Sequence, residues 1–450
     1  MEKPTPTYTY AVFGIVLLSL LFRLVAAFYW QDQTEKTGRL FRFGDSHSYW
    51  VLATAVGRGE PYQYGSENSK IFRAPLYPIV LAPLTWLQGA HDEPTRIAIV
   101  SARIFGCIAG TFCVWCIIAT TRKLGGDTAS MIAGGLACCY PGAIGMSIFI
   151  LSESIFCPLM LTSIAILVHG LRLEAPITSR KSPFVWSGSL AGLACLARPS
   201  FFLWALALAM YFFVSMVRFR TFPTTNPRYH KPSLFASWSL FLMAFILVML
   251  PWWVRNYCVT GKFVGTTLQV GASLYDGMHA GASGSSDENM EFVIPFWEEQ
   301  ASEDARNRLA GIPLESTYEW RLDQRMKNAA IAWCLENPSD VIRLALIKLQ
   351  KTFRPFPVAA EVGSGWIRVA EGVAYLLILV SGIWGAWELR NEIGCWLFVL
   401  PLVYFGAIHM IFIGSVRYRQ PAILILCVLA GIGLHRFSER IGFSWVHSKK

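Results

Sequence analysis

The chain has 450 residues, of which 54% are hydrophobic and only 15% are charged. In soluble domains about a quarter of the residues are charged, so this composition excludes an ordinary soluble protein and indicates an integral membrane protein. The formal net charge of +10 does not indicate nucleic-acid binding, because excess lysine and arginine mark the cytoplasmic loops of a membrane protein.

Apolar runs of the length that crosses a bilayer as a helix, about 17–23 residues, recur along the whole chain. The first run has no small-residue cleavage site after it, so we predict a retained span and not a signal peptide. In chain order the runs cover residues 10–30, 74–89, 97–119, 128–150, 151–170, 184–197, 199–217, 233–253, 368–387, 393–413 and 421–437.

Basic connectors between these runs indicate the orientation of the chain. The positive-inside rule places them in the cytoplasm, which means that runs 74–89 and 97–119 cannot both cross the membrane. Run 74–89 contains three prolines, each of which removes a backbone donor, so we expect it to lie at the outer face. The alternation then predicts a bundle of about 10 (10–13) transmembrane helices with juxtamembrane helices on the extracytoplasmic side. The connectors are Arg122-Lys123, the stretch 172–181, the stretch 218–231 and the tail with Arg436, Arg440, Lys449 and Lys450.

A polar segment over residues 254–367 is too long to be a simple connector. It divides the chain into an N-terminal transmembrane catalytic module (1–253, with a first outer loop at 31–96), the extracytoplasmic segment itself, and C-terminal helices with a basic tail (368–450).

Two features of the outer segment can be predicted from its sequence. Residues 341–353 separate apolar from basic positions and predict an amphipathic helix on the membrane surface, with Lys348 on its polar side and Ser339 or Asp340 as its cap. Cys258 and Cys334 also lie in this segment. They would form a disulfide outside the cytoplasm, and two free thiols are an equally good interpretation.

Ionisable residues gather at the outer ends of the runs. Asp45 follows run 10–30, and Glu153 stands at the outer start of run 151–170. Ionisable groups at membrane depth are costly and mark a functional site by default. The arginines at corresponding ends are Arg73, Arg198, Arg255, Arg354, Arg417 and Arg419.

Two acids and several arginines at one membrane face suit a phosphate-bearing substrate and a hydroxyl that must lose its proton. A sugar joined to a lipid phosphate already has a good leaving group. Displacement at its anomeric carbon needs one carboxylate as a base and fixed positive charge on the departing phosphate. A single displacement inverts the anomeric configuration. In this interpretation Asp45 is the base, while Glu153 orients the acceptor, holds a divalent ion or tunes the base.

Each of these residues also has a purely structural interpretation. Asp45 would cap a helix, Glu153 would be an interface residue, and Arg198, Arg417 and Arg419 would anchor the chain at the membrane surface. Asp45 and His47 form only a weak metal signal, because one pair without further ligands is insufficient. The sequence therefore leaves a divalent metal ion open.

Six short motifs occur in a particular order along the chain. They are GDSHSYWVLATAVGRGEPY, RAPLYPIVLAPL, LSES, LARPS, PWWVRNYCVTGKF and VRYRQP. In this order they resemble motifs of the polytopic GT-C glycosyltransferases. The resemblance is strongest to the bacterial branch related to dolichyl-phosphate-mannose protein mannosyltransferases and the lipid A aminoarabinose transferase.

This resemblance implies a GT-C-like helical bundle, a polyprenyl- or dolichyl-phosphate sugar donor, and transfer on the extracytoplasmic side. The family's catalytic acid in the first outer loop corresponds to Asp45 and its second-loop acid to Glu153. The arginine of the proline-rich motif corresponds to Arg73, a contact for the lipid phosphate. Many relatives carry two adjacent acids where this chain has Asp45-Ser46, and often an aspartate where it has Glu153. Further candidate contacts for the lipid phosphate are Arg255, Arg417 and Arg419.

We therefore expect an inverting glycosyltransferase of a bacterial inner membrane, with its site on the periplasmic side. It would move a sugar from a polyprenyl-phosphate donor to a hydroxyl of a lipid, glycan or protein acceptor of the cell envelope. The alternative class is a transporter or flippase of lipid-linked oligosaccharide, which should show an internal repeat and charged or broken helices near the bilayer midplane. A third class, a non-catalytic scaffold, would not need Asp45.

Overall fold

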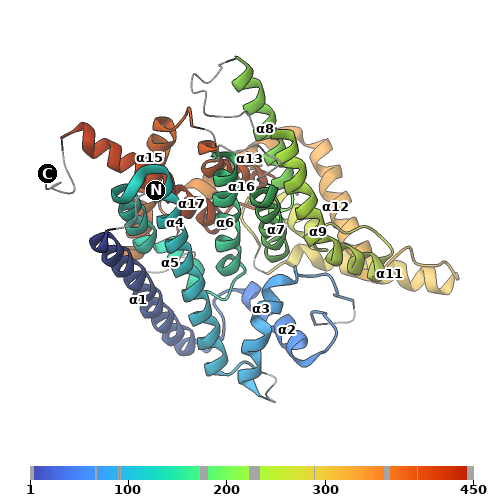
Figure 1. Cartoon of the computed structure of the whole chain (residues 1–450). Helices are drawn as coiled ribbons and strands as arrows, with labels where there is room; N and C mark the ends of the chain where they lie inside the picture. Colours follow the sequence, from blue (N-terminus) through green and yellow to red (C-terminus); the bar gives the residue numbers. More distant parts are fainter. Residues whose placement is uncertain are drawn as a thin grey trace.

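The computed structural model describes residues 5–65, 68–89, 91, 93–172, 181–221, 234–287, 289–358, 365–392 and 394–442. These residues form helices joined by turns and loops, and they contain no strand (Figure 1). The expected class, an all-α polytopic membrane protein, is therefore confirmed. Much of the predicted basic connectors at 172–181 and 218–231 lies outside the described residues, as do Lys449 and Lys450 of the tail.

Seven helical segments of the described chain are long and apolar enough to cross a bilayer. Two further predicted runs correspond to shorter helices, α7 (Lys181–Ala197) and α16 (Leu400–Ile411). The predicted count of about ten spans is therefore not confirmed. The seven segments are α1 (Pro6–Lys36), α4 (Arg96–Cys139), α6 (Glu153–Arg172), η3 (Pro199–Phe201) with α8 (Trp204–Thr221), α9 (Leu234–Thr260), α15 (Gly365–Glu388) and α17 (Val416–Arg440).

The predicted runs 97–119 and 128–150 are divided differently in the structure. α4 extends through the first run and most of the second as two helical stretches that meet at Gly126, where a φ of 85° breaks the helical geometry. The helix ends at Cys139, and a separate short helix, α5 (Pro141–Ile148), follows. The prediction of a single helix over run 128–150 was wrong, because this run is divided between the end of α4 and α5. The apolar character continues past Tyr140, but Pro141 lacks the amide N–H that would continue the helix.

The first outer loop folds into two short helices, α2 (Gly44–Arg58) and α3 (Leu76–Thr85), the second followed by the turn η1 (Trp86–Gln88). The ten residues of α3 rise only about 15 Å, half of the roughly 30 Å hydrocarbon core of a bilayer. α3 packs against α2, α4 and α7. Run 74–89 is thus too short to cross as a helix, in agreement with the sequence-based expectation.

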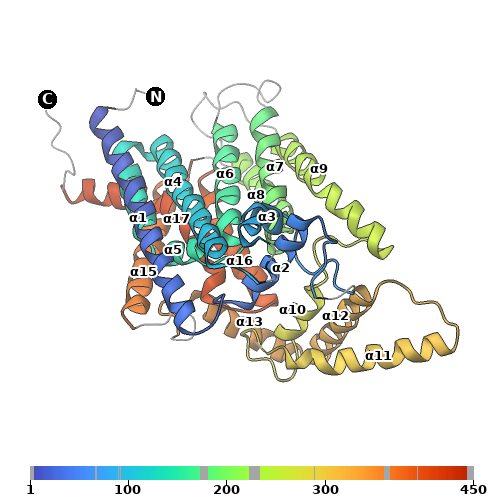
Figure 2. The same cartoon turned by 90° about the horizontal axis from the view of Figure 1, so that it is seen from below.

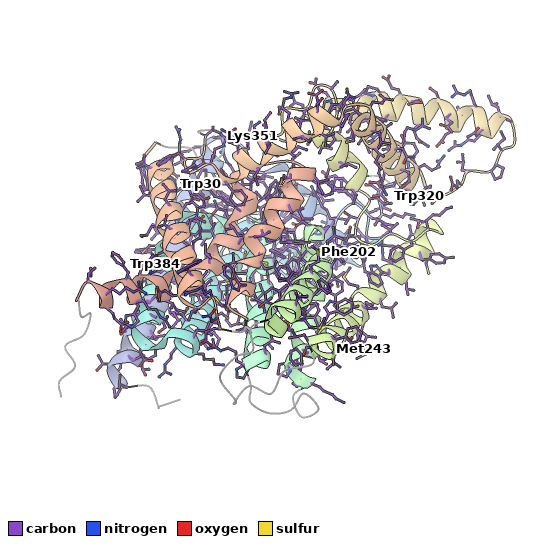
Figure 3. The ribbon with its side chains drawn as sticks, turned by 90° about the horizontal axis from the view of Figure 1, so that it is seen from above. Trp30, Phe202, Met243, Trp320, Lys351 and Trp384 are labelled. Carbon is purple, nitrogen blue, oxygen red and sulfur yellow. The ribbon has the colours of Figure 1, made fainter. Side chains whose placement is uncertain are left out.

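The outer segment forms α10 (Val270–Gly277), η4 (Glu291–Val293), α11 (Ile294–Leu309), α12 (Tyr318–Glu336) and α13 (Pro338–Phe353). Figure 2 shows α10–α13 together at the end of the molecule opposite to both termini. Figure 3 places Trp320 and Lys351 toward this end and Met243 toward the other. Cys258 and Cys334 are both free thiols, so the structure contains no disulfide between them.

The predicted amphipathic helix at 341–353 corresponds to α13, but it does not lie freely on a surface. α13 packs against α16 and α17. Lys348, expected on the polar face, is fully buried, and its ammonium donates to the carbonyl oxygen of Ile411 at 2.9 Å. The N-cap residue is Asn337, with Asp340 in the first turn. The sequence pattern could not reveal this position of Lys348, because the covering residues come from a segment more than sixty positions away.

The centre of the bundle is α17, which packs against α15 and α4 and is buried continuously from Arg419 to Gly433. A Cβ atom at Gly385 would lie 2.0 Å from the carbonyl oxygen of Leu429, and one at Gly433 would lie 2.2 Å from that of Ser381. Small residues at these positions let two helix backbones approach closely, as is common between membrane helices. The VRYRQP motif forms the amino-terminal end of the same helix, from Val416 to Pro421.

Candidate active site

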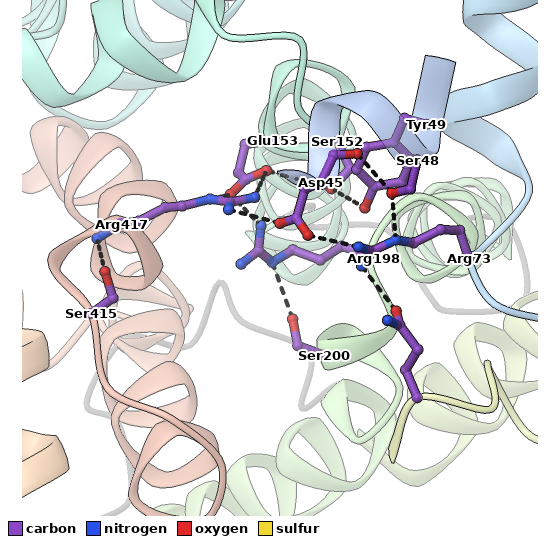
Figure 4. A network of polar contacts seen from close by, with 11 residues as sticks. Asp45, Ser48, Tyr49, Arg73, Ser152, Glu153, Arg198, Ser200, Ser415 and Arg417 are labelled. Carbon is purple, nitrogen blue, oxygen red and sulfur yellow. Dashed lines mark hydrogen bonds and ion pairs between the residues drawn. The ribbon is translucent and has the colours of Figure 1, made fainter. Parts of the chain in front are cut away.

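Five charged side chains from five separate parts of the chain meet at one end of the bundle (Figure 4). Asp45 lies in the first turn of α2, Glu153 is the first residue of α6, and Arg417 lies in the first turn of α17. Arg73 lies in the loop before α3, and Arg198 lies between α7 and η3. The grouping of Asp45 and Glu153, expected from the topology, is therefore observed.

Asp45 is held between two guanidinium groups. Its Oδ1 lies 2.7 Å from Nη2 of Arg73, and its Oδ2 lies 2.9 Å from Nη1 of Arg417. The alternative interpretation of Asp45 as a helix cap is wrong, because the N-cap residue of α2 is Phe43 and no side chain caps this helix. The Asp45 side chain remains 34% exposed, so it lies at the solvent-exposed edge of the cluster.

Glu153 forms the inner end of the cluster and is completely buried. Arg417 binds it with two bonds, Nε to Oε1 at 2.5 Å and Nη2 to Oε2 at 3.2 Å. Arg198 reaches the same Oε1 through Nη1 at 2.6 Å. The fully buried carboxylate is thus neutralised by two arginines, and Arg417 bridges it to Asp45.

Arg73 uses its whole guanidinium group for contacts. Besides Asp45, its Nε donates to Oγ of Ser48 at 3.0 Å and its Nη1 donates to Oε1 of Gln269 at 2.9 Å. The ring of Tyr49 lies 5.3 Å from its Cζ. Because Gln269 belongs to the outer segment, Arg73 joins the first outer loop to that segment at the edge of the cluster.

The charge balance makes this cluster suited to an anion. The three guanidinium groups and two carboxylates leave a net charge of +1 in a largely buried space. Burial by itself would raise the pKa of the Asp45 carboxyl, but the positive charges of Arg73 and Arg417 outweigh it and hold that pKa well below its usual range. An incoming phosphate would meet guanidinium groups that are already fixed in position, and it would compete with the carboxylates for their N–H donors.

Two of the predicted phosphate contacts lie elsewhere. Arg255 donates from Nη2 to the carbonyl oxygens of Tyr62 and Lys70, at 3.2 and 2.9 Å, and so supports the first outer loop. Arg419 is fully buried between α17 and the end of α13, where it donates to the carbonyl oxygens of Thr352, Arg354 and Pro355. The structure brings neither side chain to the carboxylates of the cluster.

Three residues of the site, Arg198 of the cluster and the uncharged Ser48 and Gln269, receive no assigned role from the sequence. The sequence places Arg198 at an outer end and allows an anchoring role equally well, whereas its ion pair with Glu153 makes it part of the cluster. Ser48 lies one helical turn after Asp45, a spacing that places both on one face of α2. Gln269 carried no signal at all, because an uncharged residue in a long outer segment has no pattern that distinguishes it.

A divalent metal ion does not suit the donors of this cluster. Every oxygen of Asp45 and Glu153 already bonds a guanidinium group, and three positive charges surround the two acids. His47 points elsewhere, with Nδ1 3.4 Å from the hydroxyl of Tyr64. Within the described part of the chain, no three histidine, cysteine or acidic side chains group as metal ligands would.

The sequence was compared with models of known protein families and with curated proteins. The family model for dolichyl-phosphate-mannose-protein mannosyltransferase matches residues 81–265, less than half of the chain. None of the curated proteins compared with the chain matches its sequence.

Solved structures match over nearly the whole chain. The oligosaccharyltransferase AglB from Archaeoglobus fulgidus, in complex with an inhibitory peptide and a dolichol-phosphate, has 12% identity and a TM-score of 0.60, with 97% of this chain and 51% of that chain covered. The apo form of the Archaeoglobus fulgidus oligosaccharyltransferase has 13% identity and a TM-score of 0.59, with 96% and 51% covered. ArnT from Cupriavidus metallidurans bound to undecaprenyl phosphate has 17% identity and a TM-score of 0.42, with 95% and 79% covered.

The two oligosaccharyltransferase matches, with TM-scores of 0.60 and 0.59, and the family model show the class to which the fold belongs. The chain has the fold of the GT-C membrane glycosyltransferases, and the resemblance inferred from its six motifs is confirmed. It spans about half the length of the oligosaccharyltransferases that it matches. At these identities the likeness establishes the fold alone, so the activity has to be argued from the site.

Proposed function

We propose that the protein is an inverting glycosyltransferase that moves a sugar from a polyprenyl-phosphate donor to an acceptor hydroxyl at the extracytoplasmic face of the membrane. The observation that carries this proposal is the clamp on Asp45. A partly exposed carboxylate lies between two arginines that a phosphate would attract. The dolichol-phosphate bound to the archaeal oligosaccharyltransferase supports a lipid phosphate as the donor's anionic group.

The reaction is one displacement. The acceptor oxygen attacks the anomeric carbon, its proton passes to a carboxylate oxygen of Asp45, and the bond from the anomeric carbon to the phosphate oxygen breaks. The electron pair of that bond stays on the phosphate, which leaves as a monoester dianion. Arg73 and Arg417 would bind this growing charge more tightly than the charge of the intact diester, which is what transition-state stabilisation requires.

The clamp also implies an order of events. In the unliganded site both oxygens of Asp45 bond guanidinium groups, and its lowered pKa makes it a weak base. A donor phosphate that draws Arg73 or Arg417 toward itself would weaken this grip, so Asp45 would become more basic only after the donor has bound. Glu153 and Arg198 would keep Arg417 oriented during the exchange. We assign no step to a metal ion.

The alternative function, a flippase of lipid-linked oligosaccharide, calls for charged groups near the bilayer midplane. The cluster lies instead at the first turns of α2, α6 and α17, that is, at helix ends, which favours an enzyme. We place this enzyme in a bacterial inner membrane with its site on the periplasmic side, where the acceptor would be a lipid, glycan or protein of the cell envelope.

The full chain in nanodiscs, given a panel of undecaprenyl-phosphate sugars and envelope acceptors, should release undecaprenyl phosphate and form a glycosidic bond of inverted configuration. Mass spectrometry would detect both products, and the anomeric proton coupling in NMR would report the configuration. Translocation of a fluorescent lipid-linked glycan without cleavage of its phosphate bond would show that the flippase alternative is correct. A product with retained configuration would exclude the single displacement.

We expect Arg73→Ala to lower kcat/KM for the donor by about 100-fold, since removing one preorganised donor to a developing charge costs this much in comparable sites. Arg73→Lys should recover little, because one ammonium cannot serve Asp45, Ser48 and Gln269 together. The exposed Arg96, paired with Glu35 on the surface, provides a matched control as Arg96→Ala. An unchanged dependence of rate on donor concentration in Arg73→Ala would leave Arg73 with a structural role only.

A further inference from the structure

Helix α12 of the outer segment contacts both segments of backbone that hold Arg73 in place. The carboxylate of Glu319 accepts the backbone N–H groups of Lys70 and Ile71, through Oε2 at 2.9 and 3.0 Å. One turn further along the helix, Oδ1 of Asp323 accepts the N–H of Gly271 at 2.7 Å. The contacts of Glu319 lie three and two residues before Arg73, and that of Asp323 lies two residues after Gln269.

These two segments are also joined to each other. The N–H of Leu268 donates to the carbonyl oxygen of Ile71 at 3.0 Å, and Nη1 of Arg73 donates to Oε1 of Gln269 at 2.9 Å. Ile71 is fully buried in a small apolar cluster with Trp252, Val264 and Leu268. The backbone that carries Arg73 and the backbone that carries Gln269 therefore form one unit, and α12 fastens this unit at two points.

The fit between α12 and the second segment leaves no space for another residue. A Cβ atom at Gly271 would lie 2.0 Å from the carbonyl oxygen of Asp323, so only glycine lets its N–H reach the carboxylate. Neither Glu319 nor Asp323 makes an ion pair within the described part of the chain, although Asp323 is buried and Glu319 is half-buried. Besides the N–H of Gly271, Asp323 accepts the side-chain amide of its neighbour Gln324 at 3.4 Å. The hydrogen bonds to both carboxylates thus come from neutral donors, and shielded carboxylates without a charged partner are costly.

We propose that Glu319 and Asp323 are positioning residues that hold Arg73 and Gln269 at the phosphate end of the active site. The role of Arg73 as a phosphate contact rests on the function proposed above. The contacts of α12 with the two segments do not depend on it. The outer segment thus contributes to the donor site through a helix that itself never reaches the reacting atoms.

The protonation of these two carboxyls gives the proposal a recognisable pH signature. Burial raises the pKa of Glu319 to about 7 and that of Asp323 to about 6, against the opposing effect of the N–H groups they accept. The charged groups that face them are Arg255 of α9, which faces Glu319, and Lys327 of α12, which faces Asp323; the two acids also face each other. A neutral carboxyl accepts weaker hydrogen bonds than a carboxylate, so the hold on Arg73 should loosen as the pH falls through this range.

The effect on stability has the opposite sign. Because both pKa values are raised in the folded state, the folded protein binds more protons than the unfolded chain between the ordinary and the raised values. These two groups therefore add stability as the pH falls from about 7 toward 5. A loss of ligand affinity that accompanies this gain in stability cannot be explained by acid unfolding.

The first arm of the test needs no ligand. Hydrogen exchange of the full chain in nanodiscs at about pH 7.5 would compare the wild type with Glu319→Gln/Asp323→Asn and with the matched control Glu336→Gln, an exposed carboxylate at the end of the same helix. We expect exchange at least about threefold faster in peptides over residues 68–73 and 268–273 of the double variant, and no change in the control. Unchanged exchange in the double variant would overturn the proposal.

The second arm measures binding of an undecaprenyl-phosphate sugar, a phosphodiester that keeps one negative charge throughout, between about pH 8 and 5.5. The wild type should lose about fivefold in affinity over this range. The double variant should show the weaker affinity at every pH, and Glu336→Gln should follow the wild type.

If the wild type binds with no pH dependence while Arg73→Ala still abolishes binding, the positioning role is wrong and the proposed function stands. If no variant binds the lipid phosphate at all, the proposed function fails, and the exchange arm still decides whether α12 holds the two segments. If the double variant does not fold, the titration of the wild type decides alone.

Discussion

Asp45→Asn should abolish sugar transfer, with kcat reduced by about 1,000-fold or more, because a general base contributes this much and an amide cannot accept the proton. The fold should persist, since the side chain is only partly buried and the amide keeps the shape of the carboxyl. Turnover of a polyprenyl-phosphate sugar by the purified variant is the measurement. The exposed Asp32, paired with Lys36 on α1, supplies the matched control Asp32→Asn, which should behave as the wild type.

The same variant should bind the donor's lipid phosphate at least as tightly as the wild type. Removal of one carboxylate raises the net charge of the cluster from +1 to +2 and frees both Arg73 and Arg417 from their ion pairs with Asp45. A purely structural Asp45 would give the opposite result, since the loss of a structural ion pair would weaken binding and transfer together. Near-normal turnover in Asp45→Asn would exclude Asp45 as the base.

The pH profiles of the wild-type kinetic constants distinguish the state of Asp45 in the free enzyme from its state in the complex with the donor. The profile of kcat/KM reports groups of the free enzyme and that of kcat reports groups of the complex. With both arginines on Asp45, its lowered pKa keeps it ionised through the acidic range, so it should add no acid limb to kcat/KM. Once the phosphate draws the arginines away, its pKa rises, so Asp45 should add an acid limb to the profile of kcat. The acid limb of kcat/KM should come instead from Glu319 and Asp323.

The sequence predicts some features of this site and not others. Counting membrane crossings predicts that Asp45 and Glu153 lie at the same membrane face, and this prediction needs only the charges of distant connectors. The number of spans is harder to predict from the sequence. A helix ends before Pro141 inside one apolar run, and the short helices α7 and α16 form in two others. Composition records how apolar a stretch is, whereas the end of a helix depends on single residues and their packing.

The sequence does not predict which partner each side chain contacts. Arg198 and Arg255 both stand at outer ends of helices in the same pattern, yet one pairs with Glu153 and the other supports the backbone of the first outer loop. Gln269 enters the site from a segment with no motif. Such contacts depend on which surfaces the bundle brings together, and no local pattern encodes them.

The VRYRQP motif offers the sharpest test of this point, because two arginines only two positions apart should fail in different ways. Arg417→Lys should lower kcat/KM by about 100- to 1,000-fold, since a single ammonium cannot bridge Asp45, Glu153 and a phosphate as the planar guanidinium does. The melting temperature of the Arg417→Lys variant should change little, because Glu153 keeps its ion pair with Arg198 and Asp45 keeps its ion pair with Arg73.

Arg419→Lys should do the reverse. The Arg419 guanidinium lies 3.6 Å from the ring centroid of Tyr375 and donates to three carbonyl oxygens at the end of α13, so its loss should cost about 2–4 kcal/mol of folding stability. The molecules that remain folded should transfer sugar at the normal rate. Thermal unfolding and turnover measured on the same preparations, with Arg440→Lys at the other end of α17 as the control, would show both effects. Equal losses of activity per folded molecule in Arg417→Lys and Arg419→Lys would mean that both arginines act on the substrate, and the separation inferred from their contacts would be wrong.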